Sequence, residues 1–269
     1  MLWNAKNGSV PIGGTEMNYV SFGRGKKALV LLPGLSDGLA NVKGKALLLA
    51  GPYRLFFDNY TVYMFSRKNA LPAGTSIRDM AADQAAAMAR LGLDRASVLG
   101  VSQGGMIAQY LAIDHPEMVE KLVLAVTAPC ANDVVRGCVG HWIDLARRGD
   151  HRQLMIDTAE KSYSEAKLKS YRRIYPILGF VGRPASYDRF IANAEAILAF
   201  DARGGLGDIT CPTLVLGGAE DRTVGPEAAG QLHDAIPGSR LYVYPGLGHN
   251  AYEEAPDFYR RVFDFLQRA

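Results

Sequence analysis

Residues 96–110 read ASVLGVSQGGMIAQY, and this stretch decides the fold. An apolar, partly β-branched run leads into it and a helix-like pattern leads out, which predicts a strand, a sharp turn and a helix. The turn carries the pattern G-x-S-x-G around Ser102, with Gly100 and Gly104 on either side. A residue at the tip of so sharp a turn is strained, with φ above zero, and its neighbours must be small. We therefore expect the Ser102 hydroxyl to stand clear of a sheet, at the N-terminus of a helix.

The composition around this turn is that of an ordinary globular protein, with 269 residues, 48% hydrophobic and 21% charged. The length suits one α/β domain with an insertion better than two independent domains. A net charge of +3 is too small to indicate binding to nucleic acid or to a membrane surface. No apolar run reaches about 18 residues, and residues 1–10 lack the basic and apolar parts of a signal peptide. The sequence gives no indication of oligomeric state.

Cysteine usage points to the compartment. Cys130, Cys138 and Cys211 are an odd number in a chain of this size, which is not a disulfide framework. A bridge between Cys130 and Cys138 is an alternative, but two unpaired small hydrophobes are the better interpretation. These features predict a protein of the reducing cytoplasm.

Apolar runs alternate with helix-like segments along most of the chain. Residues 8–22 are typical of a hairpin of two strands around Gly13-Gly14. Further strands are predicted at residues 28–32, 61–65, 98–101, 121–126, 213–216 and 240–244. Helices are predicted at residues 43–50, 77–91, 104–113, 226–236 and 256–268. This alternation predicts an α/β protein with a mostly parallel, eight-stranded sheet flanked by helices.

The rhythm changes between residues 129 and 208, where no buried-strand run occurs. Gly and Pro residues there separate four helical segments. These segments lie near residues 134–148, 151–162, 165–175 and 186–200. We interpret residues 129–208 as a helical lid inserted after the sixth strand, with residues 1–128 and 209–269 forming the core domain.

A serine hydroxyl needs a general base, itself oriented by a third group, before it can act as a nucleophile. In an open parallel sheet such groups gather at the carboxyl ends of the strands. Among five histidines, His249 alone follows the end of a sheet strand, in a glycine-containing loop. The others lie at a helix end, in the predicted lid or inside a helix: His115, His141, His151 and His233. His249 is the candidate base, and the alternative is that it caps the last helix or fills a gap.

The candidate acid is Asp221, just beyond the strand at residues 213–216. At the carboxyl end of the penultimate strand, its carboxylate can accept a hydrogen bond from His249. A helix cap or a surface turn is the structural alternative for this residue. Glu220 beside it is the direct competitor, and Asp133 after the sixth strand is a remote one. Asp208 precedes its strand and should lie at the wrong end of the sheet. The chain order Ser102, Asp221, His249 is that of a known hydrolase arrangement.

Two backbone N–H groups are needed where negative charge develops on a substrate carbonyl oxygen. The N–H of Gln103, directly after Ser102, is the first candidate. The second should come from the loop after the strand at residues 28–32, where Pro33 has no N–H to offer. Leu35 is the candidate donor in that loop, with Ser36 as the alternative.

Four segments carry a family resemblance: GVSQGG, DHPEMVEKLVLAV, GGAEDRTVGPE and GLGHNAYEEAPDFYRRVFDFL. They resemble the α/β-hydrolase superfamily over nearly the whole chain, and its lidded branch of small bacterial serine hydrolases in particular. Two places depart from the family pattern. Pro33-Gly34 stands for the family's His-Gly, and Ser66-Arg67-Lys68-Asn69 stands where a Gly-x-Gly-x-Ser turn is frequent. Because Ser102 and not Asp holds the nucleophile position, the resemblance argues against haloalkane dehalogenase or epoxide hydrolase chemistry.

The resulting prediction is a serine hydrolase that forms an acyl-enzyme, with a small to medium carboxylic ester as its substrate. The same triad can cleave carbon–carbon bonds in ring-opened diketones, or pass the acyl group to a bound acceptor. A slow-turnover ligand receptor in signalling is the alternative from another class. Neither metal-binding nor dinucleotide-binding spacing occurs, so we expect no cofactor and only a small-molecule partner.

The predicted lid decides the substrate. Its aromatic residues are large enough to roof a pocket, although most of them should pack between helices. They are Trp142, Tyr163, Tyr171, Tyr175, Phe180, Tyr187 and Phe190. We interpret its basic residues as a solvated face, with steering of an acidic substrate as the alternative. They include Arg147, Arg148, Arg172 and Arg173.

Overall fold

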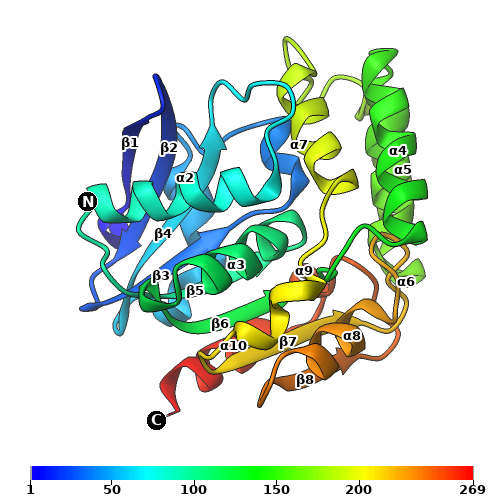
Figure 1. Ribbon diagram of the computed structural model, residues 1–269. Helices are drawn as coiled ribbons and strands as arrows, with labels where there is room; N and C mark the ends of the chain where they lie inside the picture. Colours follow the sequence, from blue (N-terminus) through cyan, green and yellow to red (C-terminus); the bar gives the residue numbers. More distant parts are fainter. Residues whose placement is uncertain (1, 269) are drawn as a thin grey trace.

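The computed structural model describes residues 2–268, and its eight strands form one sheet. The strands are β1 Lys6–Ile12, β2 Thr15–Gly23, β3 Lys27–Leu32, β4 Tyr60–Lys68, β5 Ala96–Val101, β6 Val119–Ala125, β7 Thr213–Gly218 and β8 Arg240–Tyr244. Their order in the sheet is β1-β2-β4-β3-β5-β6-β7-β8 (Figure 1). β2 pairs antiparallel with β1 and β4, and every other pair is parallel. The predicted mostly parallel, eight-stranded sheet is confirmed.

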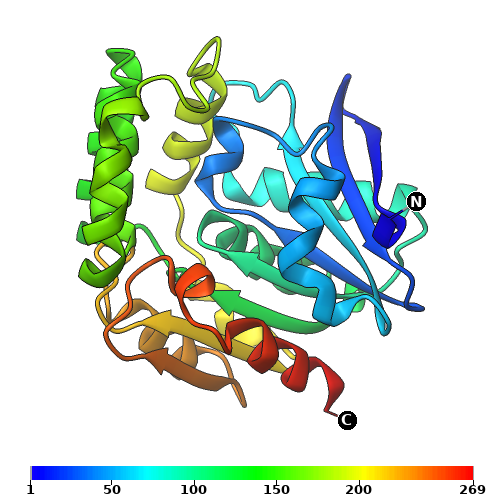
Figure 2. The same ribbon diagram turned by 180° about the vertical axis from the view of Figure 1, so that it is seen from behind.

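Helices cover both faces of this sheet (Figures 1 and 2). Those outside the region between β6 and β7 are α1 Ala46–Ala50, α2 Ile77–Arg90, α3 Gln103–Asp114, α8 Ala228–Ala235, α9 Ala251–Glu254 and α10 Phe258–Gln267, with 3₁₀ helices η1 Leu2–Asn4, η2 Leu35–Gly38, η3 Gly51–Phe56 and η4 Pro116–Met118. One core cluster packs α2, α3 and α8 on one face, and a second packs α1, η3 and α10 on the other.

β3 illustrates why the sheet needs helices on both sides. Val30 and Leu32 belong to the cluster under α2 and α3, whereas Leu29 and Leu31 belong to the cluster under η3 and α10. All four side chains are at most 3% exposed. Because successive side chains of a strand point to opposite faces, a continuous apolar run can only be buried between two layers of helices.

The chain between β6 and β7 forms a helical segment, residues 133–208. It contains α4 Asp133–Arg147, α5 His151–Ser162, α6 Glu165–Tyr171, η5 Arg172–Ile177, α7 Asp188–Leu198 and η6 Arg203–Asp208. α4, α5 and α7 stand together at one side of the sheet (Figures 1 and 2), and α7 packs between α4 and η2. This contact brings the helical segment against the loop that follows β3.

Two helix boundaries and one short helix differ from the sequence prediction. Residues 165–175 do not form one helix, because α6 ends at Tyr171 and Pro176 has no N–H and clashes with a regular helical turn. The helix predicted at residues 43–50 is regular only in α1 and continues as η3. α9 was not predicted at all, since four residues are too few to give a periodic pattern.

The sheet order also fixes where a site can form. β3 lies between β4 and β5, so the loops that leave β3 and β5 diverge in opposite directions. At such a switch point a crevice opens outside the carboxyl ends of the strands. Ser102 follows β5 and the Pro33–Gly38 loop follows β3, so the two segments meet at this crevice. Within residues 2–268, no helix is long and apolar enough to cross a membrane.

Candidate active site

Ser102 occupies the turn between β5 and α3 with a left-handed backbone, φ 53° and ψ −119°. Its N–H donates to the Ala125 carbonyl at 2.9 Å, and its own carbonyl accepts from the Gly105 N–H at 2.8 Å. A Cβ atom at Gly104 would lie 1.9 Å from the Leu32 carbonyl oxygen, and one at Gly100 would lie 2.4 Å from the Gly104 oxygen. The backbones thus approach as closely as the glycines of the sequence pattern predict, and the strained serine is confirmed.

Ser102, His249 and Asp221 form one continuous chain of hydrogen-bonding groups. Nε2 of His249 lies 2.9 Å from Ser102 Oγ, and Nδ1 lies 2.8 Å from Asp221 Oδ2. A carboxylate accepts hydrogen bonds, so Nδ1–H donates to Asp221 and Nε2 is left to accept from the Ser102 hydroxyl. His249 is 6% and Asp221 2% exposed. The geometry is that of a serine hydroxyl next to an oriented base.

Asp221 is held in place by its own turn. Its Oδ1 accepts the N–H groups of Thr223 at 2.8 Å and Val224 at 2.9 Å, which leaves Oδ2 for His249. A backbone hydrogen bond of 2.9 Å from Glu220 N–H to the Leu247 carbonyl ties this turn to the His249 loop. Two segments far apart in the sequence therefore present the carboxylate and the imidazole in a fixed relation.

The competing residues lie elsewhere. Glu220 and Asp133 are exposed, and Asp208 ends η6 on the amino-terminal side of β7. The other histidines are placed as the sequence predicted: His115 caps the end of α3, and His141, His151 and His233 lie in α4, α5 and α8.

The loop after β3 lies against Ser102. A Cβ atom built on Gly34 would be 3.3 Å from Ser102 Cβ and 3.8 Å from its Oγ. Leu35 begins η2 and Gln103 begins α3, and the first N–H groups of a helix have no acceptor within the helix. Ser36, the alternative donor, is the second residue of η2. Both predicted donors therefore belong to segments that adjoin the serine.

A buried charged group beside these two loops was missed by the sequence reasoning. Arg67, near the end of β4, is 4% exposed, and its Nη2 donates to the Pro33 carbonyl at 2.6 Å and to Gln103 Oε1 at 2.7 Å. Burial lowers the pKa of Arg67 to about 10, while the nearby Asp37 carboxylate opposes that shift. The available signal was a basic residue so soon after a buried apolar run, since arginine is rarely buried unless paired.

Several of the aromatic and basic side chains predicted for the lid contact one another. Trp142 and Phe190 are buried, the Tyr163 and Tyr171 rings lie 5.1 Å apart, and Phe180 is 85% exposed. Arg147 pairs with Glu195, and Arg172 pairs with Glu160 and Glu165, all within the segment. These contacts agree with packing and a solvated face as the main roles of these residues.

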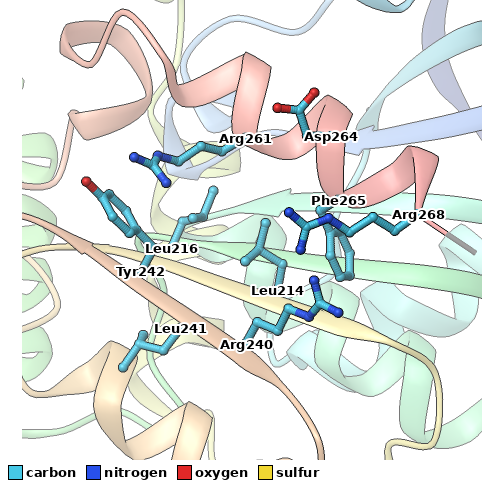
Figure 3. A pocket seen from close by; sticks show the side chains of 9 residues that line it. All are labelled: Leu214, Leu216, Arg240, Leu241, Tyr242, Arg261, Asp264, Phe265 and Arg268. Carbon is cyan, nitrogen blue, oxygen red and sulfur yellow. The ribbon is translucent and has the colours of Figure 1, made fainter.

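Other features of the described chain do not add to the site. Among residues 2–268, no group of three or more His, Cys, Asp or Glu side chains is arranged to hold a metal ion. A groove of about 260 Å³ lies between α10 and the strands β7 and β8, and Arg240, Tyr242 and Arg261 are among the residues that line it (Figure 3). None of its lining residues belongs to the Ser102 site. Cys130, Cys138 and Cys211 are free.

Comparison with known proteins agrees with this geometry. Residues 27–256 match the family described as alpha/beta hydrolase fold. The chain is 30% identical over 267 residues to a 2-hydroxy-6-oxononadienedioate/2-hydroxy-6-oxononatrienedioate hydrolase 2 of Pseudomonas putida, covering 94% of this chain and 92% of that protein. It is 31% identical over 188 residues to a pimeloyl-[acyl-carrier protein] methyl ester esterase of Pectobacterium atrosepticum, covering 65% of this chain and 71% of that protein.

A solved structure supports the fold in the same way. The alpha/beta hydrolase enzyme MGS-M2, from a Medee basin deep-sea metagenome library, superposes with a TM-score of 0.83 at 18% identity, covering 97% of this chain and 98% of that one. The evidence for the fold therefore includes this structure and the family match over residues 27–256, in addition to the two relatives. The chain therefore belongs to the α/β-hydrolase family and is a hydrolase.

Proposed function

We propose that this enzyme is a serine hydrolase with Ser102 as nucleophile, His249 as general base and Asp221 as the group that orients His249. The observation that carries the proposal is the chain of contacts of 2.9 Å and 2.8 Å that joins the three side chains. His249 Nε2 takes the Ser102 proton as Oγ attacks a substrate carbonyl carbon. Asp221 keeps the imidazole in the required tautomer and stabilises the imidazolium.

The N–H groups of Leu35 and Gln103 then bind the oxygen of the tetrahedral intermediate, which carries the negative charge. The N-terminus of α3, where Gln103 is the first residue, adds a favourable dipole. His249 returns its proton to the leaving group, which departs as an alcohol and leaves an acyl-enzyme. Water, activated by the same imidazole, releases the acid.

The substrate we propose is a small to medium carboxylic ester, bound beneath residues 129–208 acting as a lid. Two observations support this. The methyl ester esterase of Pectobacterium is a 31% identical relative, and α7 of the helical segment packs against η2, the element that begins with Leu35. The free cysteines support a reducing compartment such as the cytoplasm as the place of action.

Labelling by a fluorophosphonate probe tests the nucleophile, and an ester panel with varied acyl length tests the substrate class. We expect wild-type protein to be labelled and Ser102→Ala not. Turnover should fall by about 10⁴–10⁶ in Ser102→Ala and by about 10⁴ in Asp221→Asn, in which the imidazole takes the wrong tautomer. Asp133→Asn is the matched control, because this carboxylate is exposed and has no hydrogen bond to Ser102, Asp221 or His249, and it should keep full activity. Full activity in Ser102→Ala would disprove the assignment.

Carbon–carbon bond cleavage is the second candidate. The observation that favours it is the 30% identical relative from Pseudomonas putida, which covers 94% of this chain and is named for a 2-hydroxy-6-oxo dioate substrate. The same triad can act on a ring-opened diketone of that kind. Adding such a diketone to the ester panel separates the two: turnover of the diketone without turnover of short esters would replace the ester assignment.

A further inference from the structure

A buried polar network joins four elements around Ser102: the loop after β3, the end of β4, the start of α3 and helix α7. Its members are Asp37, Arg67, Gln103, Arg189 and Asn193, and we call it the Arg67 network. Asp37 is 3%, Arg67 4%, and Gln103 and Asn193 0% exposed. The Arg189 side chain is 16% exposed.

The first branch of the network holds the peptide that carries the Leu35 N–H. The carbonyl of that peptide, Gly34 O, accepts the Asp37 N–H at 3.2 Å. The Asp37 carboxylate oxygen Oδ2 in turn accepts the Arg67 N–H at 3.0 Å and Arg189 Nη2 at 2.6 Å. Arg67 Nη2 also donates to the preceding carbonyl, Pro33 O, at 2.6 Å. Rotation of this peptide would break the bond from Asp37 N–H to Gly34 O, and the chain on either side is held through Pro33 O and the Asp37 carboxylate, so the direction of the Leu35 N–H is constrained.

The second branch holds Gln103, whose backbone N–H is the other donor. Its side-chain Oε1 accepts from Arg67 Nη2 at 2.7 Å, and its Nε2 donates to the Asn193 carbonyl of α7 at 2.8 Å. The same guanidinium nitrogen therefore contacts both loops that supply donors. Because the amide is bonded at both ends, the first turn of α3 cannot shift without disturbing Arg67 and α7.

Helix α7 is attached to the network at two more points. Arg189 donates to the Lys68 carbonyl at 3.1 Å and to the Arg67 carbonyl at 3.0 Å, besides its bonds to Asp37. All of these acceptors lie in the core, whereas Arg189 lies in the helical segment. The seating of α7 on the core and the placement of the two donors are therefore parts of one hydrogen-bonded structure.

The network also carries charge. Arg67 Nη1 lies 3.6 Å and Arg189 Nη2 2.6 Å from the single carboxylate of Asp37. Even with its pKa lowered to about 10 by burial, Arg67 is protonated at neutral pH. The two guanidinium groups and the one carboxylate together carry one excess positive charge. Arg67, which bears part of it, is hydrogen-bonded to the Gln103 side chain. Where the dielectric constant is low, such a charge favours a negative charge on a nearby oxygen atom.

Fold stability alone does not account for this arrangement. Buried ion clusters are often no more stabilising than apolar side chains of the same volume, because the charges lose their hydration. Among the described residues, Arg67 Nε and Nη1 have no hydrogen-bond partner, so the desolvation of this guanidinium is only partly offset. A role in the reaction gives a reason for a cluster that a stable core does not require.

We infer that Asp37, Arg67 and Arg189 are positioning residues that aim the Leu35 and Gln103 N–H groups at the oxyanion and make their aim depend on the seating of α7. The inference rests on the proposed function, because it takes these two N–H groups as the oxyanion donors. It adds that the helical segment, besides covering the substrate, completes the catalytic geometry through Asn193 and Arg189.

Gln103→Ala is the most discriminating variant, because it keeps the backbone donor and removes only the two side-chain bonds. We expect kcat to fall about 10- to 100-fold while KM changes less than about 3-fold, since a donor that is misaimed loses part of what a deleted donor loses. The affinity for an aryl boronic acid, which forms a tetrahedral adduct on Ser102, should fall by the same factor as kcat. Binding of the carboxylic acid product, which needs no oxyanion contact, should change little. Arg67→Met and Arg189→Met should act in the same direction.

Gln109→Ala is the matched control. Gln109 lies in the same helix, is equally buried at 0% exposure, and donates to a backbone carbonyl, Ala128 O, at 3.0 Å. It makes no contact with Arg67, so its loss should leave kcat and boronate affinity unchanged. Thermal unfolding of each variant establishes that it is folded, and if Arg67→Met does not fold, the pair Gln103→Ala and Gln109→Ala decides alone.

The inference is overturned if folded Gln103→Ala keeps kcat and boronate affinity within about 3-fold of wild type, or if Gln109→Ala loses as much. Failure of the proposed function is seen separately, because wild-type protein would then neither be labelled at Ser102 nor turn over any ester. A labelled, active wild type with unaffected network variants contradicts only the positioning role.

Discussion

Two parts of the helical segment use apolar residues in opposite ways. In α4 and α7 the large apolar side chains are buried, with Trp142 at 5% and Phe190 at 3% exposure. In residues 172–187 most of them are exposed, with Ile177 at 55%, Phe180 at 85% and Val181 at 53%, and Leu178 at 3% is the exception. α4 and α7 run for 15 and 11 residues and can present one apolar face to a neighbour, whereas Gly and Pro interrupt the other stretch. Burial of the large apolar side chains therefore follows the continuity of the helix more than the number of aromatic residues.

Charged residues follow the same division. Arg189 in α7 is 16% exposed at its side chain and bonds to Asp37 and to core carbonyls. Arg172 in η5 is 42% exposed and pairs with Glu160 and Glu165 of the helical segment itself. Arginine thus links the helical segment to the residues around Ser102 at position 189, whereas at position 172 it forms ion pairs on the surface of the segment. We expect substitutions in α4 and α7 to cost far more than those in residues 172–187.

A large effect on stability should come from Trp142→Ala. The indole is buried and its Nε1 donates to Asp157 Oδ2 at 2.7 Å, which joins α4 to α5. We expect the free energy of unfolding to fall by about 3–5 kcal/mol, from lost burial, a cavity and the lost hydrogen bond between α4 and α5. Urea denaturation followed by tyrosine fluorescence and circular dichroism measures it. A loss below about 1 kcal/mol would mean that α4 is not part of the cooperative core.

Ser164→Ala tests a second attachment, at the corner between α5 and α6. Ser164 Oγ accepts the Lys167 N–H as the cap of α6 and donates to Glu254 Oε2 of α9, the short helix after His249. Loss of this cap should cost about 1 kcal/mol. Ser170→Ala is the control, since the Ser170 hydroxyl is exposed and donates only to the Lys167 carbonyl of its own helix. Equal effects of the two substitutions would contradict an attachment at Ser164.

The sequence predicted the elbow, the sheet and the meeting of Ser102, Asp221 and His249, because each depends on a local pattern. The G-x-S-x-G turn needs small residues, and buried strands read as apolar runs. A parallel sheet then brings the carboxyl ends of its strands together. This rule predicts that Ser102 meets Asp221 and His249, although both lie far from it in the sequence. The roles of these residues and of the Leu35 and Gln103 N–H groups stay predictions.

The Arg67 network could not be predicted, because it depends on which side chains meet across elements. Nothing near Arg189 in the sequence distinguishes it from Arg172, and both stand in polar, helix-forming surroundings. The difference arises when α7 packs between α4 and η2 and buries one of its faces against the core. The sequence points to Gln103 only through its backbone N–H, and nothing in it signals the bonds of the side chain to Arg67 and Asn193.

A change of pH should produce a smaller effect, confined to the surface cluster of the helical segment. Hydrogen bonds from Arg172 lower the pKa of Glu160 to about 2, against an ordinary value of 4.5. Because the folded-state pKa is the lower one, the pair stabilises the protein above about pH 5, and this contribution is lost as the pH falls toward 2. Glu160→Gln should therefore lower the free energy of unfolding at pH 7, but by less than Ser164→Ala does. The difference between Glu160→Gln and wild type should vanish near pH 2. A difference that persists at low pH would rule out the ion pair as its source, and added salt should reduce it at pH 7.

The smallest effect should come from Phe180→Ser, which asks whether residues 172–187 contribute apolar packing at all. With 85% of its surface exposed, Phe180 gains almost nothing from folding, so removal of its ring should change the free energy of unfolding by less than about 0.5 kcal/mol. Phe190→Ser in α7 is the matched substitution at a buried ring of the same kind, at 3% exposure, and should cost about 3–5 kcal/mol. Urea denaturation of both variants gives the contrast directly. If Phe180→Ser destabilised the protein by as much as Phe190→Ser, continuity of the helix would not be what divides the segment. If it left stability unchanged but altered turnover of long-chain esters, this exposed ring would contact substrate and not the core.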